Sequence, residues 1–471
     1  MTVTNWHGSV SSSPARVVNV TRVDEIVTAL LNPADYPPPV RPVGSNHSVT
    51  EVNVANGGTL LDMTAMNRIL AIDENPAAPT VIAEAGARFI DVAHALRGNR
   101  DGHDEPYAPG LQFYVNTEIG NLTLGAAATA ATKSASFYPD EFGQVGSYVT
   151  QVKLVRPNGQ LATVSGEELK VVRSSYGLLG VVYEVTMAVR RHEMMAVRHE
   201  QMTLNEFIAR FAELNALRDS VRMFLFPYDD RVVVEYRNYT GKITGPTNPE
   251  IFQIRNFIWK WGAPVVGAVV NLAPPLPRFG SRMVSDELES IIDRGLEFGL
   301  EHVLHADSTS PTDQIVEFEH TPGLERYAFS MWAFCATNFP LVLSEYFSFC
   351  KDFEVRTDFR TSMPHISYRI RQDRSALLSY SYDNDVWTLD PVSAGTEPQW
   401  PEFLCEFNQL CTRHDGRPLF NQTPNLTPTQ AYQAYGERLT EFERERRRHD
   451  PRNRLLNPHF KHLLSRAAKQ V

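Results

Sequence analysis

A histidine stands inside a short loop of small and polar residues: Val43, Gly44, Ser45, Asn46, His47 and Ser48. Glycine, serine and asparagine allow a backbone to turn several N–H groups toward one point, which is how a phosphate is bound. An imidazole in such a loop lies against whatever the loop holds. The pattern indicates a nucleotide cofactor in contact with His47, and the alternative is an ordinary surface turn with a solvated histidine.

A second stretch that could contact a ligand is residues 123–132, where Leu124 is the one large side chain. Small residues let a backbone approach a flat or phosphorylated ligand closely, and the threonines add hydroxyl groups. The alternative is an alanine-rich helix buried against a sheet. Further along, Gly177 and Gly180 stand just before a strand-like run and mark another place of close approach.

The elements that must position these loops alternate between strands and helices over the first 190 residues. β-branched runs predict strands at residues 16–20, 80–86, 149–155 and 181–189. Apolar residues at helical spacing predict a helix at residues 23–30. This order is typical of an α+β domain, and no Gly-x-Gly-x-x-Gly motif opens a helix, so a Rossmann fold is disfavoured.

The composition changes after residue 190, which indicates a second α+β domain. Aromatic-rich strands are predicted at residues 232–236 and 376–382, and a helix at residues 286–299. One charged helix is predicted at residues 431–447, with the arginines 446–448 on its solvated face. We therefore divide the chain into residues 1–190, residues 191–430 and a C-terminal segment, residues 431–471.

Charge and cysteine usage exclude several classes of partner. The chain of 471 residues has a formal net charge of −10, which argues against a nucleic acid or an anionic membrane. No stretch approaches the roughly 20 apolar residues of a membrane span, and the first residues do not form a secretory signal. The four cysteines lack C-x-x-C spacing, which predicts reduced thiols of a cytoplasmic protein without a metal site: Cys335, Cys350, Cys405 and Cys411.

Four blocks in a fixed order carry a resemblance to a known family. They are Asn5-Trp6-His7-Gly8, the loop at residues 41–48, the run at residues 123–134 and residues 177–185. With them the chain resembles the FAD-binding domain of the vanillyl-alcohol-oxidase-type (PCMH-type) flavoproteins. The start and the tail, which contains Asp450-Pro451 and Leu456-Asn457-Pro458, resemble the sugar-lactone and alditol oxidase branch more closely. The resemblance covers the first 190 and the last 40 residues well and the middle in patches.

This resemblance implies a two-subdomain FAD-binding domain under an α+β cap domain with an antiparallel sheet. Residues 43–46 and Ser48 are then expected to wrap the pyrophosphate, and His47 to carry FAD through an 8α-histidyl bond. Such a bond prevents cofactor loss and raises the potential of the flavin. The other cofactor-binding residues that the resemblance implies are Gly125, Ala126, Thr129, Thr132, Ser134 and Val182.

The resemblance also implies a reacting pair in the cap, Glu354 and Arg356. Residues two apart in a strand share one face, and in this branch a Glu-x-Arg pair faces the flavin and the reacting carbinol. The arginine would stabilise negative charge on the reduced flavin or on an alkoxide-like transition state. The glutamate would orient the hydroxyl group or share its proton. The alternative is a salt-bridged strand at the surface.

One segment departs from the pattern of the branch. Its members usually carry Gly-Arg-Pro-His-Trp-Gly-Lys near the end of the cap, with the lysine close to the pyrimidine edge of the flavin. Here Leu419 replaces the histidine and Gln422 the lysine, so one positive charge is lost from the catalytic site. Lys133 is a candidate to replace part of that charge. A larger or less hydroxylated alcohol then becomes plausible in place of a polyol or lactone.

Together these features predict an FAD-dependent oxidase that acts on the CH–OH group of a small alcohol. Hydride passes to flavin N5, and molecular oxygen is reduced to hydrogen peroxide. The alternatives are a dehydrogenase of the same fold, a biosynthetic oxidative cyclase or desaturase with a non-sugar substrate, and a non-catalytic FAD-binding protein.

Overall fold

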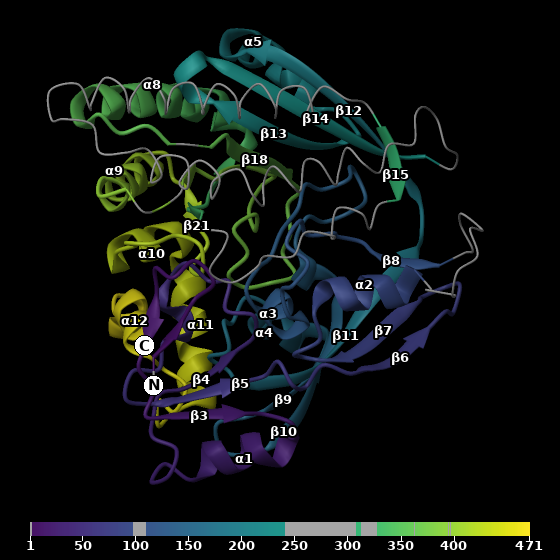
Figure 1. The fold of residues 1–471 in the computed structure, drawn as a ribbon, viewed down its shortest axis with the longest axis vertical. Helices are drawn as coiled ribbons and strands as arrows, with labels where there is room; N and C mark the ends of the chain where they lie inside the picture. The colour runs from purple at the N-terminus through teal and green to yellow at the C-terminus, as the bar shows by residue number, and fades with distance from the viewer. Residues whose placement is uncertain are drawn as a thin grey trace, which may run out of the picture.

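The computed structural model describes residues 2–97, 110–240, 308–311, 327–361, 363–393, 395 and 397–471. Figure 1 shows the sheets of the first part of the chain below and the second large sheet above, under its helices. The helix predicted at residues 286–299 lies outside the described residues.

The first part of the chain begins with a small parallel sheet. Its strands are, in spatial order, β3 (Arg16–Asn19), β5 (Thr59–Asp62) and β4 (Val40–Val43). Helix α1 (Val23–Leu31) follows β3, and its buried Ile26, Ala29 and Leu30 join a core that also contains Leu455 from the tail. The strand before the predicted phosphate loop is therefore the edge strand of this sheet.

A second, antiparallel sheet adjoins the small one. In spatial order its strands are β10 (Leu161–Ser165), β9 (Val149–Val155), β11 (Val181–Arg191), β7 (Thr80–Glu84) and β6 (Ile69–Asp73), and β8 (Leu111–Phe113) pairs with the end of β11. Its helices are α2 (Phe89–Arg97), α3 (Leu124–Thr129) and α4 (Leu169–Val172). Helix α3 contacts β7 and β11, which places the small-residue run on this sheet.

The second large sheet has eight strands. In spatial order they are β15 (Ser308–Pro311), β12 (Met194–Thr203), β14 (Arg231–Thr240), β13 (Ser220–Phe226), β18 (His365–Ile370), β19 (Val386–Leu389), β17 (Trp332–Cys335) and β21 (Arg417–Pro418). The chain passes from the first domain to this sheet between Arg191 and Met194. Helices α5 (Leu204–Asn215), α8 (Phe339–Thr357) and α9 (Trp400–Arg413) lie at the end of the molecule away from the small parallel sheet (Figure 1).

The C-terminal segment returns to the first domain. Helices α10 (Pro428–Tyr435), α11 (Glu437–His449) and α12 (Pro458–Leu463) bring the C-terminus close to the N-terminus in Figure 1. Arg454 donates hydrogen bonds to the carbonyls of Ala29 and Leu30, and the Asn457 Nδ2 donates to the carbonyl of Val54 at 3.0 Å. The tail is therefore attached to the part of the chain with the small parallel sheet by hydrogen bonds from its side chains to backbone carbonyl groups.

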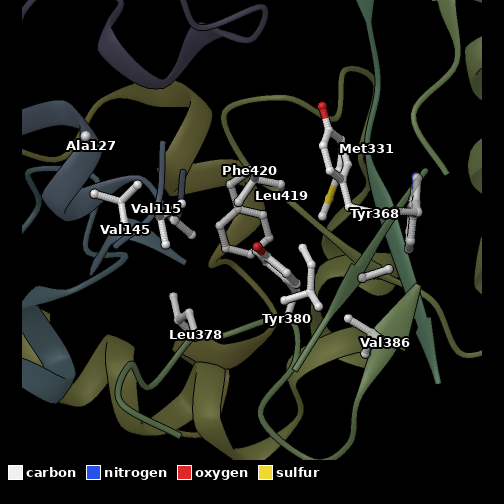
Figure 2. Packing of buried hydrophobic residues seen from close by; sticks show 14 of the residues in the cluster. Val115, Ala127, Val145, Met331, Tyr368, Leu378, Tyr380, Val386, Leu419 and Phe420 are labelled. Carbon is white, nitrogen blue, oxygen red and sulfur yellow. The ribbon is translucent and has the colours of Figure 1, made fainter. Parts of the chain in front are cut away.

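One hydrophobic core extends through both domains. Figure 2 shows Val115, Ala127 and Val145 of the first domain in the same cluster as Leu419 and Phe420 of the second. All five side chains are nearly or fully buried. Because this cluster contains side chains from both parts of the chain, these parts pack against each other along the segments that contain the predicted site residues.

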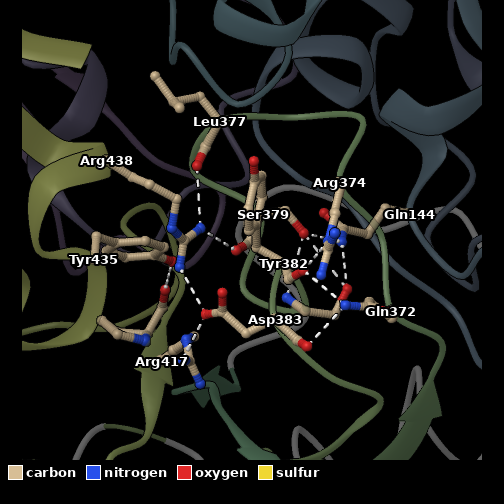
Figure 3. Close-up of polar contacts among 12 residues, drawn as sticks. Gln144, Gln372, Arg374, Leu377, Ser379, Tyr382, Asp383, Arg417, Tyr435 and Arg438 are labelled. Atoms are coloured by element: carbon tan, nitrogen blue, oxygen red, sulfur yellow. Dashed lines mark hydrogen bonds and ion pairs between the residues drawn. The ribbon is translucent and has the colours of Figure 1, made fainter. Parts of the chain in front are cut away.

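The predicted strand at residues 376–382 is wrong, and the segment predicted as one helix at residues 431–447 is helical but divided between α10 and α11. Gly436, with φ of +51°, separates α10 from α11, because only glycine adopts such a conformation without strain. Residues 376–382 form turns. The Arg438 guanidinium holds the carbonyls of Leu377 and Ser379 in this segment at 3.1 and 3.0 Å, in place of a neighbouring strand (Figure 3).

Among the arginines 446–448, Arg446 differs from the prediction of a solvated face. Arg446 is 2% exposed and forms a buried ion pair with Glu443, one turn earlier on α11. Arg448 does lie at the surface. The helical pattern therefore positions Arg446 toward the protein, where its charge is matched by a carboxylate.

The described residues contain four free cysteines, of which Cys350 and Cys411 are buried. Burial raises the pKa of both thiols. Within the same residues, no group of three or more His, Cys, Asp or Glu side chains is arranged to hold a metal ion. No helix among them has both the length and the apolar character that crossing a membrane requires.

Candidate active site

The loop that contains His47 is held in place by the N-terminal Asn5-Trp6 pair. The Asn5 Nδ2 donates to the carbonyl of Ser48 at 2.9 Å, and the Trp6 indole N–H donates to the carbonyl of His47 at 3.0 Å. The Trp6 backbone N–H donates to the carbonyl of Asn46 at 3.1 Å. Three consecutive carbonyls are thereby fixed, and the indole ring lies 5.5 Å from the His47 ring, measured between centroids.

Four N–H groups of the same loop remain available to a ligand within the described part of the chain. In the described part of the chain, the backbone N–H groups of Gly44, Ser45, Asn46 and Ser48 donate no hydrogen bond. Asn46 has φ of +58°, a left-handed conformation that turns the backbone sharply. Consecutive N–H groups without acceptors form a concavity that favours an anion. The loop therefore fits the phosphate groups of a nucleotide cofactor.

The loop packs directly on the small-residue stretch around residues 121–134, and we call the loop and this stretch the two walls of the candidate site. A Cβ atom added to Gly44 would lie 2.0 Å from the Thr123 Oγ1, so only glycine allows this approach. The Ser45 hydroxyl donates to the carbonyl of Asn121. Gly125 approaches the end of β7 equally closely, since its Cβ would lie 2.8 Å from the Ala85 Cβ. Two stretches about 80 residues apart in sequence thus form adjoining walls.

Arg41 joins this junction to the remaining blocks. Its guanidinium donates to the carbonyl of Tyr176 at 2.5 Å and to that of Leu455 at 3.0 Å. Complete burial lowers the pKa of Arg41 to about 9, so the side chain stays charged at neutral pH. Pro42 lies against Gly177, whose Cβ would be 3.0 Å from the Pro42 Cγ. All four sequence blocks and the tail therefore meet at one end of β4.

The other predicted cofactor residues differ in how open they are. Ala126 is exposed and Gly125 half-buried, so both can contact a ligand. The Thr129 hydroxyl donates to the Gly125 carbonyl at 2.8 Å, within its own helix. The Thr132 carbonyl accepts the Val145 N–H, and the Ser134 N–H donates to Gly143, both at 2.9 Å. Ser134 on this wall and Val182 on β11 are buried.

Gln422 lies beside the same junction. The Val49 N–H donates to the carbonyl of Asn421 at 3.1 Å, and the Thr50 hydroxyl donates to that of Phe420 at 2.8 Å. These bonds attach the segment with Gln422 to the end of the His47 loop. The Gln422 Oε1 accepts a long hydrogen bond, 3.5 Å, from the Lys133 Nζ. Lys133 and Gln422, which the sequence analysis linked through the lost positive charge, are therefore neighbours in space.

Two functional candidates escaped the sequence analysis, Asp390 and Tyr368. The Asp390 Oδ2 lies 2.8 Å from the Lys133 Nζ, and this Nζ lies 5.0 Å from the Tyr368 ring centroid. Burial raises the pKa of Asp390, and Lys133 opposes that shift. Burial raises the pKa of Tyr368 to about 12, so it stays protonated and can donate a hydrogen bond. The sequence signal that could have indicated Asp390 is weak: this carboxylate comes directly after the apolar strand β19.

A buried charged row crosses the cap sheet next to Tyr368. In register across four strands lie His199, Glu235, Arg222 and Tyr368. The Glu235 carboxylate lies 2.8 Å from the Arg222 guanidinium and 3.0 Å from the His199 Nε2. Arg222 also pairs with Glu118 of the first domain. Sequence reasoning missed this row, because its four members lie on four separate strands and only the pairing of the strands brings them together.

The predicted Glu354–Arg356 pair is misplaced. Both residues lie in the last turns of α8, where residues two apart point in different directions, so the predicted strand is wrong. The segment forms a helix because its buried side chains, among them Tyr346, Cys350 and Phe353, recur at helical spacing. Arg356 is exposed and pairs with Glu406 of α9 at 2.7 Å. In Figure 1, α8 and β4 lie at opposite ends of the molecule.

Replacing Arg356 tests this reassignment. We expect the Arg356→Ala variant to bleach bound flavin under anaerobic conditions at the wild-type rate, because its guanidinium pairs with Glu406 at the surface. Stopped-flow absorbance with a donor that reduces the wild type gives the rate. A tenfold or larger loss of rate would contradict the reassignment and return Arg356 to the catalytic site.

Comparison with known proteins connects this geometry to named families. The FAD binding domain family matches residues 14–165, and the D-arabinono-1,4-lactone oxidase family matches residues 185–463. L-gulono-1,4-lactone dehydrogenase of Mycobacterium tuberculosis H37Rv is 26% identical over 244 residues, 52% of this chain and 53% of the relative. D-arabinono-1,4-lactone oxidase of Saccharomyces cerevisiae is 20% identical over 242 residues, 50% of this chain and 43% of the relative. The chain thus spans about half the length of the curated relatives it matches.

The likeness to solved structures covers nearly the whole chain. The crystal structure of cholesterol oxidase from B. sterolicum superposes with a TM-score of 0.75 at 15% sequence identity, over 98% of this chain and 96% of that one. At this identity the likeness shows the fold. The predicted PCMH-type FAD-binding fold with an antiparallel cap sheet is confirmed.

Proposed function

Because the chain belongs to the D-arabinono-1,4-lactone oxidase family, we propose that it is an FAD-dependent oxidoreductase that acts on the CH–OH group of a small molecule. The observation that carries this proposal is the loop around His47. Its carbonyls are fixed by Asn5 and Trp6, while four of its N–H groups donate no hydrogen bond in the described part of the chain. A loop with this arrangement fits the pyrophosphate of FAD.

The chain supplies groups for binding and orientation. FAD, when bound, supplies the acceptor for the hydride that leaves the carbinol carbon. The N–H groups of the loop hold the phosphates, and the open Gly125 and Ala126 allow close approach of the cofactor. Gln422, which accepts a 3.5 Å hydrogen bond from Lys133, is proposed to contact the cofactor or the substrate. The remaining proposed contacts are Val43, Thr129, Thr132, Ser134 and Val182.

We propose a hydroxylated, sugar-like substrate, as the names of the relatives suggest. The expected preference for a less hydroxylated alcohol rested partly on Leu419, and this side chain is fully buried in the core beside Phe420 (Figure 2). It therefore offers no apolar surface to a substrate. The neighbouring polar groups of Tyr368 and Gln422 suit hydroxyl groups instead.

Molecular oxygen is the proposed electron acceptor, and it would be reduced to hydrogen peroxide. The second candidate is a dehydrogenase that uses another acceptor, and it is favoured by the name of the mycobacterial relative. Peroxide formation in air, compared with turnover on an artificial dye acceptor, separates the two.

An anaerobic screen tests the proposed function. Purified protein is mixed with hydroxylated lactones, polyols and apolar alcohols, and loss of the yellow flavin absorbance identifies a donor. Bleaching by a hydroxylated lactone or polyol supports the proposal. Yellow protein that bleaches only with apolar alcohols contradicts the proposed substrate class, and colourless protein that takes up no FAD contradicts the function itself.

His47 is proposed to carry FAD covalently. We expect the His47→Ala variant to release all of its flavin on acid precipitation, whereas the wild type retains yellow colour in the pellet, since only the wild type has the imidazole. Absorbance of pellet and supernatant measures the two fractions. His94→Ala, on α2, is the matched control and should behave as the wild type. Covalent flavin in the His47→Ala variant would place the attachment elsewhere.

A further inference from the structure

Lys133 and Asp390 form a buried ion pair between the two domains. Their side chains are 7% and 8% exposed, and the Nζ–Oδ2 distance is 2.8 Å. Lys133 follows α3 in the wall next to the His47 loop, whereas Asp390 follows β19 in the cap sheet. The pair therefore places a positive charge of the first domain against the cap, at the level of the predicted catalytic region.

Both partners are held by their backbones. Lys133 forms a bridge with Gln144, and its neighbours Thr132 and Ser134 each bond to the same returning segment at 2.9 Å. Asp390 exchanges two hydrogen bonds with Ile366, of 3.0 and 2.9 Å. Because the two backbones are fixed independently, the ammonium group has one defined position between them.

A third contact directs the ammonium group toward the cofactor loop. The Lys133 Nζ reaches the Gln422 Oε1 at 3.5 Å, and the segment of Gln422 is bonded to residues 49 and 50 at the end of the His47 loop. The Tyr368 ring lies under the same ammonium group at 5.0 Å. One cation thus lies where the loop, the small-residue wall and the cap meet.

Stability alone is a poor explanation for this pair. Burying two charges is costly, and apolar side chains of similar volume are often equally or more stabilising. The Asp390 Oδ1 is buried without a hydrogen-bond partner among the described residues, so the carboxylate is not fully satisfied. A functional role for the Lys133 ammonium group at this junction would explain why the buried ion pair is present.

We propose, on the basis of the proposed function, that Lys133 is the cation that stabilises negative charge on reduced FAD, and that Asp390 is the positioning residue that holds it beside Gln422. A fixed positive charge in a water-poor site favours the form of the cofactor that carries negative charge, because no solvent reorganisation is needed. The lysine would do this from a segment of the first domain, while the amide of Gln422 contributes no charge.

The reduction potential of the bound flavin measures this effect without any alcohol substrate. We expect Lys133→Met to lower the equilibrium constant for flavin reduction at least tenfold, which is about 30 mV for a two-electron couple. Dye-coupled reductive titration of the purified holoprotein gives the potential. Lys153→Met is the matched control, because Lys153 also forms a 2.8 Å ion pair in the first domain, with Glu184 on β11, and it should leave the potential unchanged.

A double variant separates electrostatics from folding. Lys133→Met leaves the Asp390 carboxylate buried without its cation, so this variant alone is expected to lose stability. Lys133→Met with Asp390→Leu removes both charges and should fold, yet its potential should remain below that of the wild type, by less than in the single variant because the opposing carboxylate is also lost. Asp390→Asn keeps the lysine but removes the carboxylate that holds it. Loss of the negative charge alone would raise the potential, so a potential below that of the wild type would show that Asp390 positions the ammonium group.

The outcomes distinguish this inference from the proposed function. Wild-type protein that binds no FAD overturns both. Protein that binds FAD, with an unchanged potential in both the single and the double variant, overturns the role of Lys133 alone. A raised KM with an unchanged potential also overturns it, because the lysine would then bind substrate. A lowered potential in the double variant, with the control unchanged, supports it.

Discussion

The Glu235→Gln variant is expected to lose about 3–5 kcal/mol of free energy of unfolding. Glu235 is fully buried on β14, where its carboxylate accepts from Arg222 at 2.8 Å and from Arg237 at 2.5 Å. The neutral amide leaves two buried guanidinium groups, with Glu118 as the remaining carboxylate partner in the described contacts. Because Glu118 belongs to the first domain, the loss should also weaken the contact between the domains.

The dependence of this loss on pH has a definite sign. Burial alone raises the pKa of Glu235, but Arg222, Arg237 and His199 outweigh it and hold the pKa well below its ordinary value of 4.5. A carboxylate with a lowered folded-state pKa contributes stability above about pH 4.5, and this contribution is lost as the pH falls further. The difference between wild type and Glu235→Gln should therefore shrink below pH 4.5.

Denaturant unfolding at pH 7 and pH 4 measures both effects. Glu406→Gln is the matched control, since Glu406 forms a single ion pair with the exposed Arg356, and its stability should match that of the wild type. A loss in Glu235→Gln no greater than in the control would contradict the buried network as a source of stability.

The Gly44→Ala variant is expected to lose about 1–3 kcal/mol of stability and most of its bound FAD. The new Cβ would lie 2.0 Å from the Thr123 Oγ1 and 2.9 Å from the Thr123 Cγ2, so the two walls must separate. Separation displaces the loop N–H groups that we propose to bind the pyrophosphate. Thermal unfolding and the flavin-to-protein absorbance ratio report the two losses.

Second substitutions at Thr123 make this prediction specific. Gly44→Ala with Thr123→Ala removes both close contacts, whereas Gly44→Ala with Thr123→Ser keeps a hydroxyl group. The first double variant should therefore recover more stability and flavin than the second. Gly146→Ala is the control, because its Cβ has no neighbour closer than 3.4 Å. Full flavin content in Gly44→Ala itself would show that the walls do not need this contact.

The loops of the first domain were predictable because their signals are local. The residue types at 43–48 and 123–132 limit what the backbone can do over a few positions, and the structure brings these stretches together at Gly44 and Thr123. The strands predicted at residues 80–86, 149–155 and 181–189 correspond to β7, β9 and β11. β-branched and apolar runs of this length determine a buried strand with little help from elsewhere.

The errors arose where a short motif was separated from its longer context. Glu354-Val355-Arg356 matches a three-residue pattern, but the nineteen residues of α8 have buried side chains at helical spacing, and this longer period decides the structure. The segment at residues 376–382 has the composition of a strand. Its carbonyls bond instead to Arg438, more than fifty residues later, which no local pattern could reveal.

The sequence by itself determined the family, the small-residue loop that contains His47 and the α+β character of both domains, because each depends on residue types within a short stretch. The tertiary structure alone decided which charges meet. Lys133 and Asp390 are 257 positions apart, and Glu118, Arg222 and Glu235 come from separate segments of both domains. A buried charge requires a partner at hydrogen-bond distance, and only the packing of one domain on the other determines which side chain that partner is.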